Sequence, residues 1–282
     1  MLHPASLLVL CTLLLAPLGL RAEDSAVITL ADQPLRLIRA ASVHKASAGV
    51  AVQAGDLLET TEAAAQIEIA QGSIVALAAD TRIYWQASGS SAQLYVLKGW
   101  VKIVQRGAGQ AVVTAPWVQL AMGEGAAIVH NTADTTELFA ESGAQTIAPL
   151  FELGRVGEEK KFPLEHYALW QPDQDLKIQP RPPKQFINDM PKHFRDPLEP
   201  APNRVKGVKN TALFERDVSY VDIRDWLTSN FTLRKTWVKR FKPRLKDKEF
   251  RAALDAELGQ TPEWKPILHP PPPKPKIIKP HP

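Results

Sequence analysis

The fold is decided by the stretch AQIEIAQGSIVAL, residues 65–77. Its first five residues alternate between apolar and polar side chains, which is the period of two expected of a half-buried β-strand. Gln71-Gly72-Ser73 then predicts a turn, because glycine reaches backbone angles that other residues avoid. A second apolar run follows at once, at residues 74–77. The stretch therefore indicates two successive strands.

Further short apolar runs follow, each separated from the next by Gly, Asp or Pro. They are residues 83–85, 94–97, 100–104, 111–113, 117–120, 126–129 and 137–139. Short strands with turn residues about every 8–12 positions are typical of all-β folds. We therefore expect a mainly β N-terminal domain, built as a sandwich, a barrel or a solenoid.

Five motifs in a fixed order give this part of the chain a resemblance to the FecR-type domain. They are GDLLET at residues 55–60, the strand at 64–69, Gly72-Ser73, LKG at 97–99 and VTAP at 113–116. The resemblance covers residues 27–150. The sequence departs from the family pattern at Gly123-Glu124-Gly125, where the family places G-T-x-F.

The resemblance also implies what the domain does. FecR-type proteins are typically inner-membrane regulators with a cytosolic helix pair that binds a sigma factor. We see no such segment ahead of the apolar N-terminal run, so we do not expect that role. The resemblance then implies an exported, non-catalytic β module that contacts other envelope proteins.

The N-terminal run LLVLCTLLLAPLGL, residues 7–20, indicates export. It is typical of a secretory signal peptide, here residues 1–22 with cleavage after Ala22. An uncleaved membrane anchor is the alternative, although the run is shorter than the roughly 20 residues that span a bilayer. The one cysteine, Cys11, lies in the run. The processed chain would have no thiol, which excludes disulfides, cysteine metal or iron–sulfur sites and cysteine nucleophiles.

Charge and proline divide the chain into two halves. Residues 23–150 carry 7 Lys and Arg against 12 Asp and Glu, whereas residues 151–282 carry 26 against 18. The second half also holds 19 of the 24 prolines. We expect a Pro-rich linker at 151–214, a small basic helical module at 215–264 and a Pro/Lys-rich disordered tail at 265–282.

Three apolar side chains stand out within the expected linker, Phe186, Met190 and Phe194. We expect them to hold the linker against the β domain, because isolated apolar side chains are most stable when buried. A recognition motif for a partner is the alternative.

Three short amphipathic helices are expected in the module. Ser219 and Asp222 have the spacing of a capping box for the first helix. Asp247 is placed to cap the third, and Gly259 to end it. Apolar side chains recur every four residues along the second and third helices, as Leu233, Trp237 and Phe241, and then as Phe250, Leu254 and Leu258.

The second helix and the segment after it are rich in cations. They are Arg234, Lys235, Lys239, Arg240, Lys242, Arg244, Lys246 and Lys248. On an exported protein such a face could bind peptidoglycan, anionic lipid or an acidic protein, and nucleic acid is not an expected partner. The alternative is a solvated helix face that is turned toward the acidic β domain and binds no ligand.

No pattern in the sequence indicates a catalytic or metal site. The seven histidines lack the spacing of a zinc motif, and neither a nucleophile elbow nor a nucleotide-binding loop occurs. Asp56, Glu59 and Glu62 form an acidic cluster that could support hydrolysis, since paired carboxylates serve as acid and base. We expect turn or surface roles for them instead.

Three tryptophans, Trp85, Trp100 and Trp117, could form a platform on which sugars stack. We expect core positions for them, because strands bury alternate residues. The sequence thus predicts an exported, non-catalytic binding or scaffold protein without cofactor or metal, whose partner is another periplasmic protein. Binding of cell-wall glycan or anionic lipid through the basic helices is the second hypothesis, and a periplasmic hydrolase is the third.

Overall fold

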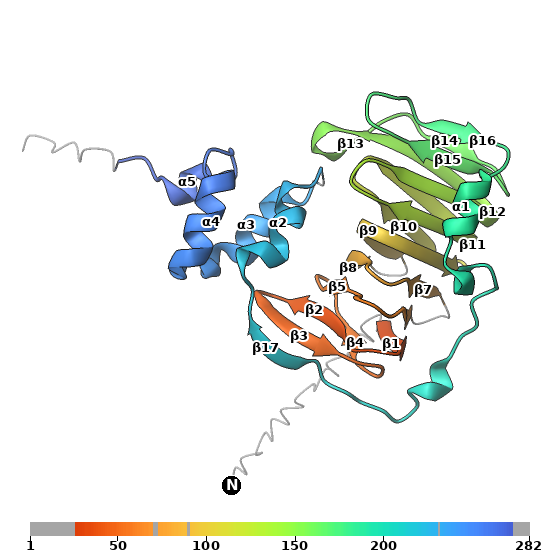
Figure 1. Cartoon of the computed structure of the whole chain (residues 1–282), viewed down its shortest axis with the longest axis horizontal. Helices are drawn as coiled ribbons and strands as arrows, with labels where there is room; N and C mark the ends of the chain where they lie inside the picture. Colours follow the sequence, from red (N-terminus) through yellow and green to blue (C-terminus); the bar gives the residue numbers. More distant parts are fainter. Residues whose placement is uncertain (1–25, 70–72, 89–90, 231, 273–282) are drawn as a thin grey trace, which may run out of the picture.

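The protein is mainly β, with 43% of its residues in strands and 22% in helices. The computed structural model describes residues 26–69, 73–88, 91–230 and 232–272, so the expected signal peptide and the end of the expected tail lie outside it. Figure 1 shows a large, open mixed sheet with a group of short helices beside it. The expected fold class is confirmed.

Twelve strands make up the segment that the FecR resemblance covers. They are β1 (Ala26–Ala31), β2 (Leu35–Arg39), β3 (Ser42–Ala46), β4 (Ala51–Val52), β5 (Leu57–Glu59), β6 (Ala65–Glu68), β7 (Ile74–Leu77), β8 (Arg82–Ser88), β9 (Ser91–Gln105), β10 (Gln110–Thr114), β11 (Val118–Asn131) and β12 (Thr136–Phe151). The two strands expected within residues 65–77 are β6 and β7, which pair antiparallel with Ile67 opposite Val75. The two runs expected after Pro116 form one continuous strand, β11.

The long strand β9 is the centre of the sheet, because it pairs with four other strands. The first half of β9 pairs with β8 and, in parallel, with β10, and its second half pairs with β7 and β11. Leu94, Val96 and Ile103 of β9 point into the main core. Tyr95 points to the opposite face, where helices cover the sheet. Both faces of the sheet are therefore buried at β9, and the alternation of apolar and polar residues along this strand is weak.

The strand series continues past residue 150, into the segment expected as a linker. Four further strands are β13 (Arg155–Val156), β14 (Lys160–Phe162), β15 (Tyr167–Trp170) and β16 (Lys177–Gln179). β13, β14 and β15 all pair with β12, and β16 pairs with β15. These strands have only two to four residues, which is too few to show alternation of apolar and polar residues in the sequence. Their extended conformation is stabilised by pairing with β12 and, for β16, with β15.

A strap, residues 180–212, then runs from one end of the sheet to the other (Figure 1). It contains α1 (Lys184–Asp189), η2 (Lys192–Phe194) and η3 (Pro202–Arg204), and it leads into β17 (Leu213–Asp217), which pairs antiparallel with β3. Phe186, Met190 and Phe194 are buried against the sheet in a core of their own, as expected.

A buried lysine fastens the strap. The Nζ atom of Lys102 donates to the carbonyl oxygens of Phe194 at 2.8 Å and Asp196 at 2.9 Å, and it pairs with Glu141 at 2.8 Å. The Lys102 side chain is 1% exposed. All three of its N–H donors are thereby satisfied, which a buried ammonium group requires.

The helical module comprises the helices that follow β17. They are α2 (Tyr220–Thr228), α3 (Arg234–Phe241), the 3-10 turn η4 (Lys242–Lys246), α4 (Lys248–Leu258) and α5 (Lys265–Leu268). The capping residues act as expected: Asp222 accepts from the N–H of Ser219, and Asp247 accepts from the N–H groups of Glu249 and Phe250. α5 lies in the segment expected as a tail. No helix in the described part of the chain is long and apolar enough to cross a membrane.

The module and the sheet share one apolar core. The rings of Trp226 and Trp237 meet Tyr84 of β8 edge to face, with centroids 6.4 Å and 5.0 Å apart. Ile38 and Leu57 join them from the sheet. Because residues from both parts are buried in this one cluster, the module is packed against the strands.

Candidate functional site

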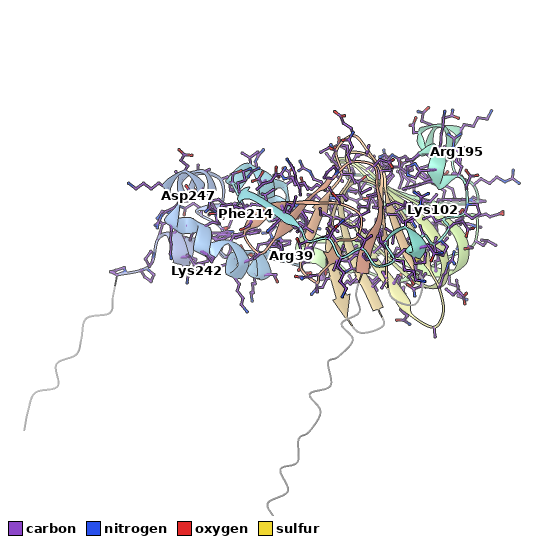
Figure 2. All side chains as sticks on the ribbon, turned by 90° about the horizontal axis from the view of Figure 1, so that it is seen from below. Arg39, Lys102, Arg195, Phe214, Lys242 and Asp247 are labelled. Carbon is purple, nitrogen blue, oxygen red and sulfur yellow. The ribbon has the colours of Figure 1, made fainter. Side chains whose placement is uncertain are left out.

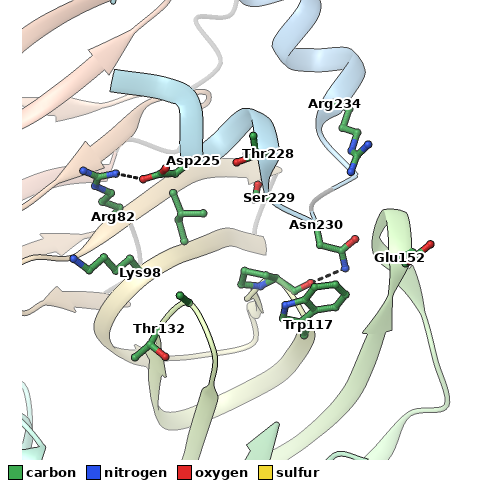
Figure 3. A pocket seen from close by; sticks show the side chains of 13 residues that line it. Arg82, Lys98, Trp117, Thr132, Glu152, Asp225, Thr228, Ser229, Asn230 and Arg234 are labelled. Atoms are coloured by element: carbon green, nitrogen blue, oxygen red, sulfur yellow. Dashed lines mark hydrogen bonds and ion pairs between the residues drawn. The ribbon is translucent and has the colours of Figure 1, made fainter. Parts of the chain in front are cut away.

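A cleft of about 700 Å³, which we call the junction cleft, lies where the strand ends meet the helical module (Figure 3). Strands and their connections supply Arg82, Lys98, Trp117, Thr132 and Glu152, and the module supplies Asp225, Thr228, Ser229, Asn230 and Arg234. A cavity of this size is in the range of small-ligand sites, about 300–1,000 Å³.

The width of the cleft is fixed by Asn230, which follows α2. Its Nδ2 atom donates to the carbonyl oxygens of Pro116 and Phe151, each at 3.0 Å. These two acceptors precede β11 and end β12, so one amide bridges the module to both strands. The bond to Pro116 is drawn in Figure 3.

One end of the cleft holds paired charges. Arg82 donates to Asp225 at 2.8 Å, across the junction between β8 and α2. Arg82 also lies 3.6 Å from Glu59, and Lys98 pairs with Asp80 at 2.5 Å. These cations are thus neutralised within the chain.

Glu59 lies beneath this end and is buried. Burial raises the pKa of its carboxyl group, and the neighbouring guanidinium groups of Arg82 and then Arg36 lower it by less. The desolvation of a charge can outweigh the attraction of its partners. Glu59 therefore serves as a buried link in the network that joins sheet and module.

The other end of the cleft holds an unpaired cation, Arg234. Its Nε atom is inaccessible to solvent and has no hydrogen-bond partner, and no carboxylate lies within ion-pair distance of the guanidinium among the described residues. Buried donors are rarely left in this state.

Trp117 forms one wall of the cleft and stacks on Trp170, which lies outside it. The rings of Trp117 and Trp170 lie nearly parallel, at 11°, with centroids 5.0 Å apart. Trp117 also lines a second cavity of about 480 Å³, together with Trp170 and Glu152. The sequence alone does not indicate Trp170 as a site residue, because it lies on β15, inside the expected linker.

The structure separates the three tryptophans of the expected platform. Trp85 is buried in the main core, as expected. Trp100 stacks on His130, with centroids 4.0 Å apart and an interplanar angle of 9°, beneath α1. Trp117 lines the junction cleft, whereas Trp85 and Trp100 pack in two other clusters of the described residues, so the three rings form no common platform.

The acidic cluster does not gather into a site. Asp56 is buried and pairs with Arg39 at 2.6 Å. Glu59 pairs with Arg36 at 3.2 Å, and Glu62 is exposed. The two buried carboxylates therefore lie against arginines and not against each other, which leaves no pair of carboxylates to share a proton. The turn or surface role expected of Glu59 is wrong, because the residue is buried on β5. No group of acidic, histidine or cysteine side chains in the described ranges could hold a metal ion.

The basic face also divides. Arg240 and Arg244 point inward: the first binds carbonyl oxygens of the β2–β3 and β4–β5 connections, and the second pairs with Asp217 and Asp247. Three exposed lysines remain on the outer face of α3 and its end, Lys235, Lys239 and Lys242, which we call the lysine stripe. Their spacing of four and three residues places them on one side of a helix, and none makes an ion pair with a described residue.

Comparison of the chain with known proteins finds only distant structural similarity. No protein-family profile matches the chain, and no curated protein is similar to it in sequence. Two crystal structures of a candidate anti-sigma factor from Parabacteroides distasonis are similar to 44% of this chain. Their identities are 10% and 8% and their TM-scores 0.38 and 0.37. The chain matches 59% and 58% of those proteins, and a likeness of this degree carries no argument about function.

Proposed function

We propose that the chain is an exported, non-catalytic scaffold protein of the cell envelope, built on a FecR-type domain, that binds another envelope protein. Export is supported by the apolar run at residues 7–20. The FecR assignment is supported by the five ordered motifs between residues 55 and 116. A binding role without catalysis is supported by the acidic cluster, whose buried carboxylates are each engaged by an arginine.

The observation that carries the proposal is the open edge of β17. Among the described residues this strand pairs only with β3. Leu213 and Phe214 are 66% and 63% exposed there, although both are large and apolar. An edge strand offers unpaired N–H and C=O groups, and exposed apolar side chains beside them favour a partner. The proposed partner contributes an extended segment that adds to the sheet next to β17.

Site-specific cross-linking tests this contact. A photoreactive residue at position 214 is expected to yield one discrete adduct with a different protein in intact cells. Val221, which is 78% exposed on α2, supplies the control position, from which no such adduct is expected. Leu213→Lys should lower the yield, since it places a charge in the apolar contact. Equal adducts from positions 214 and 221, or an adduct only with a second copy of the chain, would contradict the proposal.

Export has a separate test. Mass spectrometry of the protein purified from the envelope fraction should find an N-terminus at Glu23, the residue after the expected cleavage position. Intact chains in the cytoplasmic fraction would overturn this part of the proposal.

The lysine stripe favours a second candidate function, the binding of anionic lipid. No large apolar side chain of α3 or η4 is exposed in the described structure, so attraction would be electrostatic, without insertion. Sedimentation with phosphatidylglycerol vesicles should then fall steeply as salt is raised. Changing Lys235, Lys239 and Lys242 to Gln should abolish it, whereas Arg195→Gln, a charge far from the stripe in Figure 2, should not.

A further inference from the structure

We propose that the junction cleft binds a sugar that carries a carboxylate group. The inference rests on the combination of an aromatic wall, an unpaired guanidinium and two hydroxyl groups that can accept hydrogen bonds in one cavity. It concerns a ligand site and is independent of the edge contact at β17.

The aromatic wall is preformed. Trp117 is half-buried and is held in place by its stack on Trp170, so its ring does not have to be ordered when a ligand arrives. A flat indole offers an apolar surface against which the C–H face of a sugar ring packs. A preformed site of this kind avoids much of the entropy cost of binding.

The unpaired guanidinium supplies the charge recognition. Arg234 lies in the cleft with its Nε atom buried and without an acceptor. A guanidinium group binds a carboxylate through two parallel hydrogen bonds, and this geometry suits Arg better than Lys. Because the Nε atom is inaccessible to solvent, a bound carboxylate would be held by the two Nη atoms, which no described residue engages.

The other cations of the cleft are less suited to that role. Arg82 is engaged by Asp225, and Lys98 is engaged by Asp80. Glu152 lies on the same side of the cleft as Arg234 in Figure 3, but no ion pair joins the two among the described residues, so the guanidinium group stays unpaired. The carboxylate is thus assigned to the end of the cleft at Arg234.

Two hydroxyl groups complete the site. The Thr228 hydroxyl donates to the carbonyl oxygen of Arg224 at 3.0 Å, and the Ser229 hydroxyl donates to that of Trp226 at 2.8 Å. A hydroxyl that donates in one direction keeps lone pairs for accepting. Thr228 and Ser229 can therefore accept hydrogen bonds from the hydroxyl groups of a sugar, which a simple anion would not offer.

Saturation-transfer NMR with the processed full chain tests the inference. Glucuronate is the probe, glucose is the sugar without a carboxylate, and acetate is the carboxylate without a ring. We expect glucuronate to bind at least about tenfold more tightly than either, because only it uses both parts of the cleft. Equal binding of glucuronate and acetate would show an unspecific anion site and overturn the inference, as would a lack of saturable transfer to glucuronate.

Two matched variants locate the site. Arg234→Gln is expected to weaken glucuronate binding by about tenfold, the loss of one charged hydrogen-bonded pair. Lys235→Gln removes the same charge from the next residue of α3, outside the cleft, and is expected to leave binding within about twofold. Equal losses in the two variants would assign binding to net charge and overturn the inference. Because the three probes are compared on the unaltered chain, the test holds even if a variant folds poorly.

Discussion

Arg240 joins the helical module to the sheet through one side chain. Its three nitrogen atoms donate to the carbonyl oxygens of Ala40 at 2.6 Å, Gly55 at 2.5 Å and Ile38 at 2.7 Å. Burial lowers the pKa of Arg240 to about 10, so the group stays charged at neutral pH. Its guanidinium carbon also lies 5.2 Å from the centre of the Phe241 ring.

Replacing Arg240 tests how much its buried, hydrogen-bonded charge stabilises the fold compared with the exposed charge of a neighbouring lysine. Arg240→Gln should lower the free energy of unfolding by about 3 kcal/mol, because buried carbonyl groups lose their donors. Lys239→Gln, an exposed neighbour on the same helix, should change it by less than about 0.5 kcal/mol. Urea unfolding of the two variants measures the difference. Similar losses in both would show that Arg240 acts only through its charge.

Glu59 gives the protein a pH dependence of predictable sign. Because burial raises its pKa in the folded state, the contribution of Glu59 to stability is fully present below the pKa of the unfolded chain. That contribution is lost as the pH rises through the folded pKa. We expect the stability of the wild type relative to Glu59→Gln to fall as the pH rises above the pKa of an unfolded glutamate, about 4.3.

Urea unfolding of both proteins across this range checks the sign for Glu59. Glu62→Gln supplies the control, since Glu62 is exposed and its difference from the wild type should stay constant. A stability difference for Glu59→Gln that grows with pH would show that the arginine partners outweigh burial.

At the scale of elements, the long hairpin of β11 and β12 bends where two glycines cross. Gly125 lies opposite Gly143, and the register of the pair shifts beside them. Gly125 has a φ of +149°, and a Cβ atom there would lie 2.9 Å from the Cα atom of Gly143. A residue with a Cβ atom would be strained at this φ angle and would clash with Gly143, so this position requires glycine.

Alanine at this crossing is therefore expected to be costly. Gly125→Ala should lower the free energy of unfolding by about 3 kcal/mol, from backbone strain and the clash together. Gly123→Ala is the matched control two residues away, where a Cβ atom meets nothing within 4 Å. Thermal unfolding compares the two. Equal melting temperatures would show that the strands shift apart without cost.

Local signals predicted much of this architecture. The alternation at residues 65–69 located β6, and the side chains of Asp222 and Asp247 located the starts of α2 and α4. These signals act within a few residues of the chain, so the sequence shows them directly.

Contacts between residues that are far apart in the sequence could not be predicted from it. The strands β13, β14 and β15 depend on pairing with β12, and β16 depends on pairing with β15, so they have little pattern of their own. The candidate site escaped for the same reason. The sequence favours a core position for Trp117 over a sugar platform, and the stacking of Trp117 on Trp170 and the unpaired state of Arg234 arise only from tertiary packing.

At the scale of the whole molecule, the sheet and the module should unfold together. Tyr84 and Tyr95 of the sheet are buried in the same core as Trp226 and Trp237 of the module. We expect one thermal transition in calorimetry, because neither part can keep this core alone. Removing residues 219–282 should expose the tyrosine face and raise the binding of a hydrophobic dye.

The tail supplies the control for that truncation. Removing only residues 273–282, beyond the module, should leave the single transition and the dye binding unchanged. Two separate transitions in the full chain would contradict a shared core.

The pairing of β17 with β3 sets the order in which the chain can be completed. Ser42 lies opposite Asp217, 175 positions later in the sequence. Until β17 reaches the compartment in which the chain folds, β3 lacks this neighbour and, among the described strands, has only β2 beside it. Such a high contact order slows folding and leaves a nascent edge open to wrong pairing. A chaperone that shields β3 until residue 217 emerges would therefore speed the recovery of native protein.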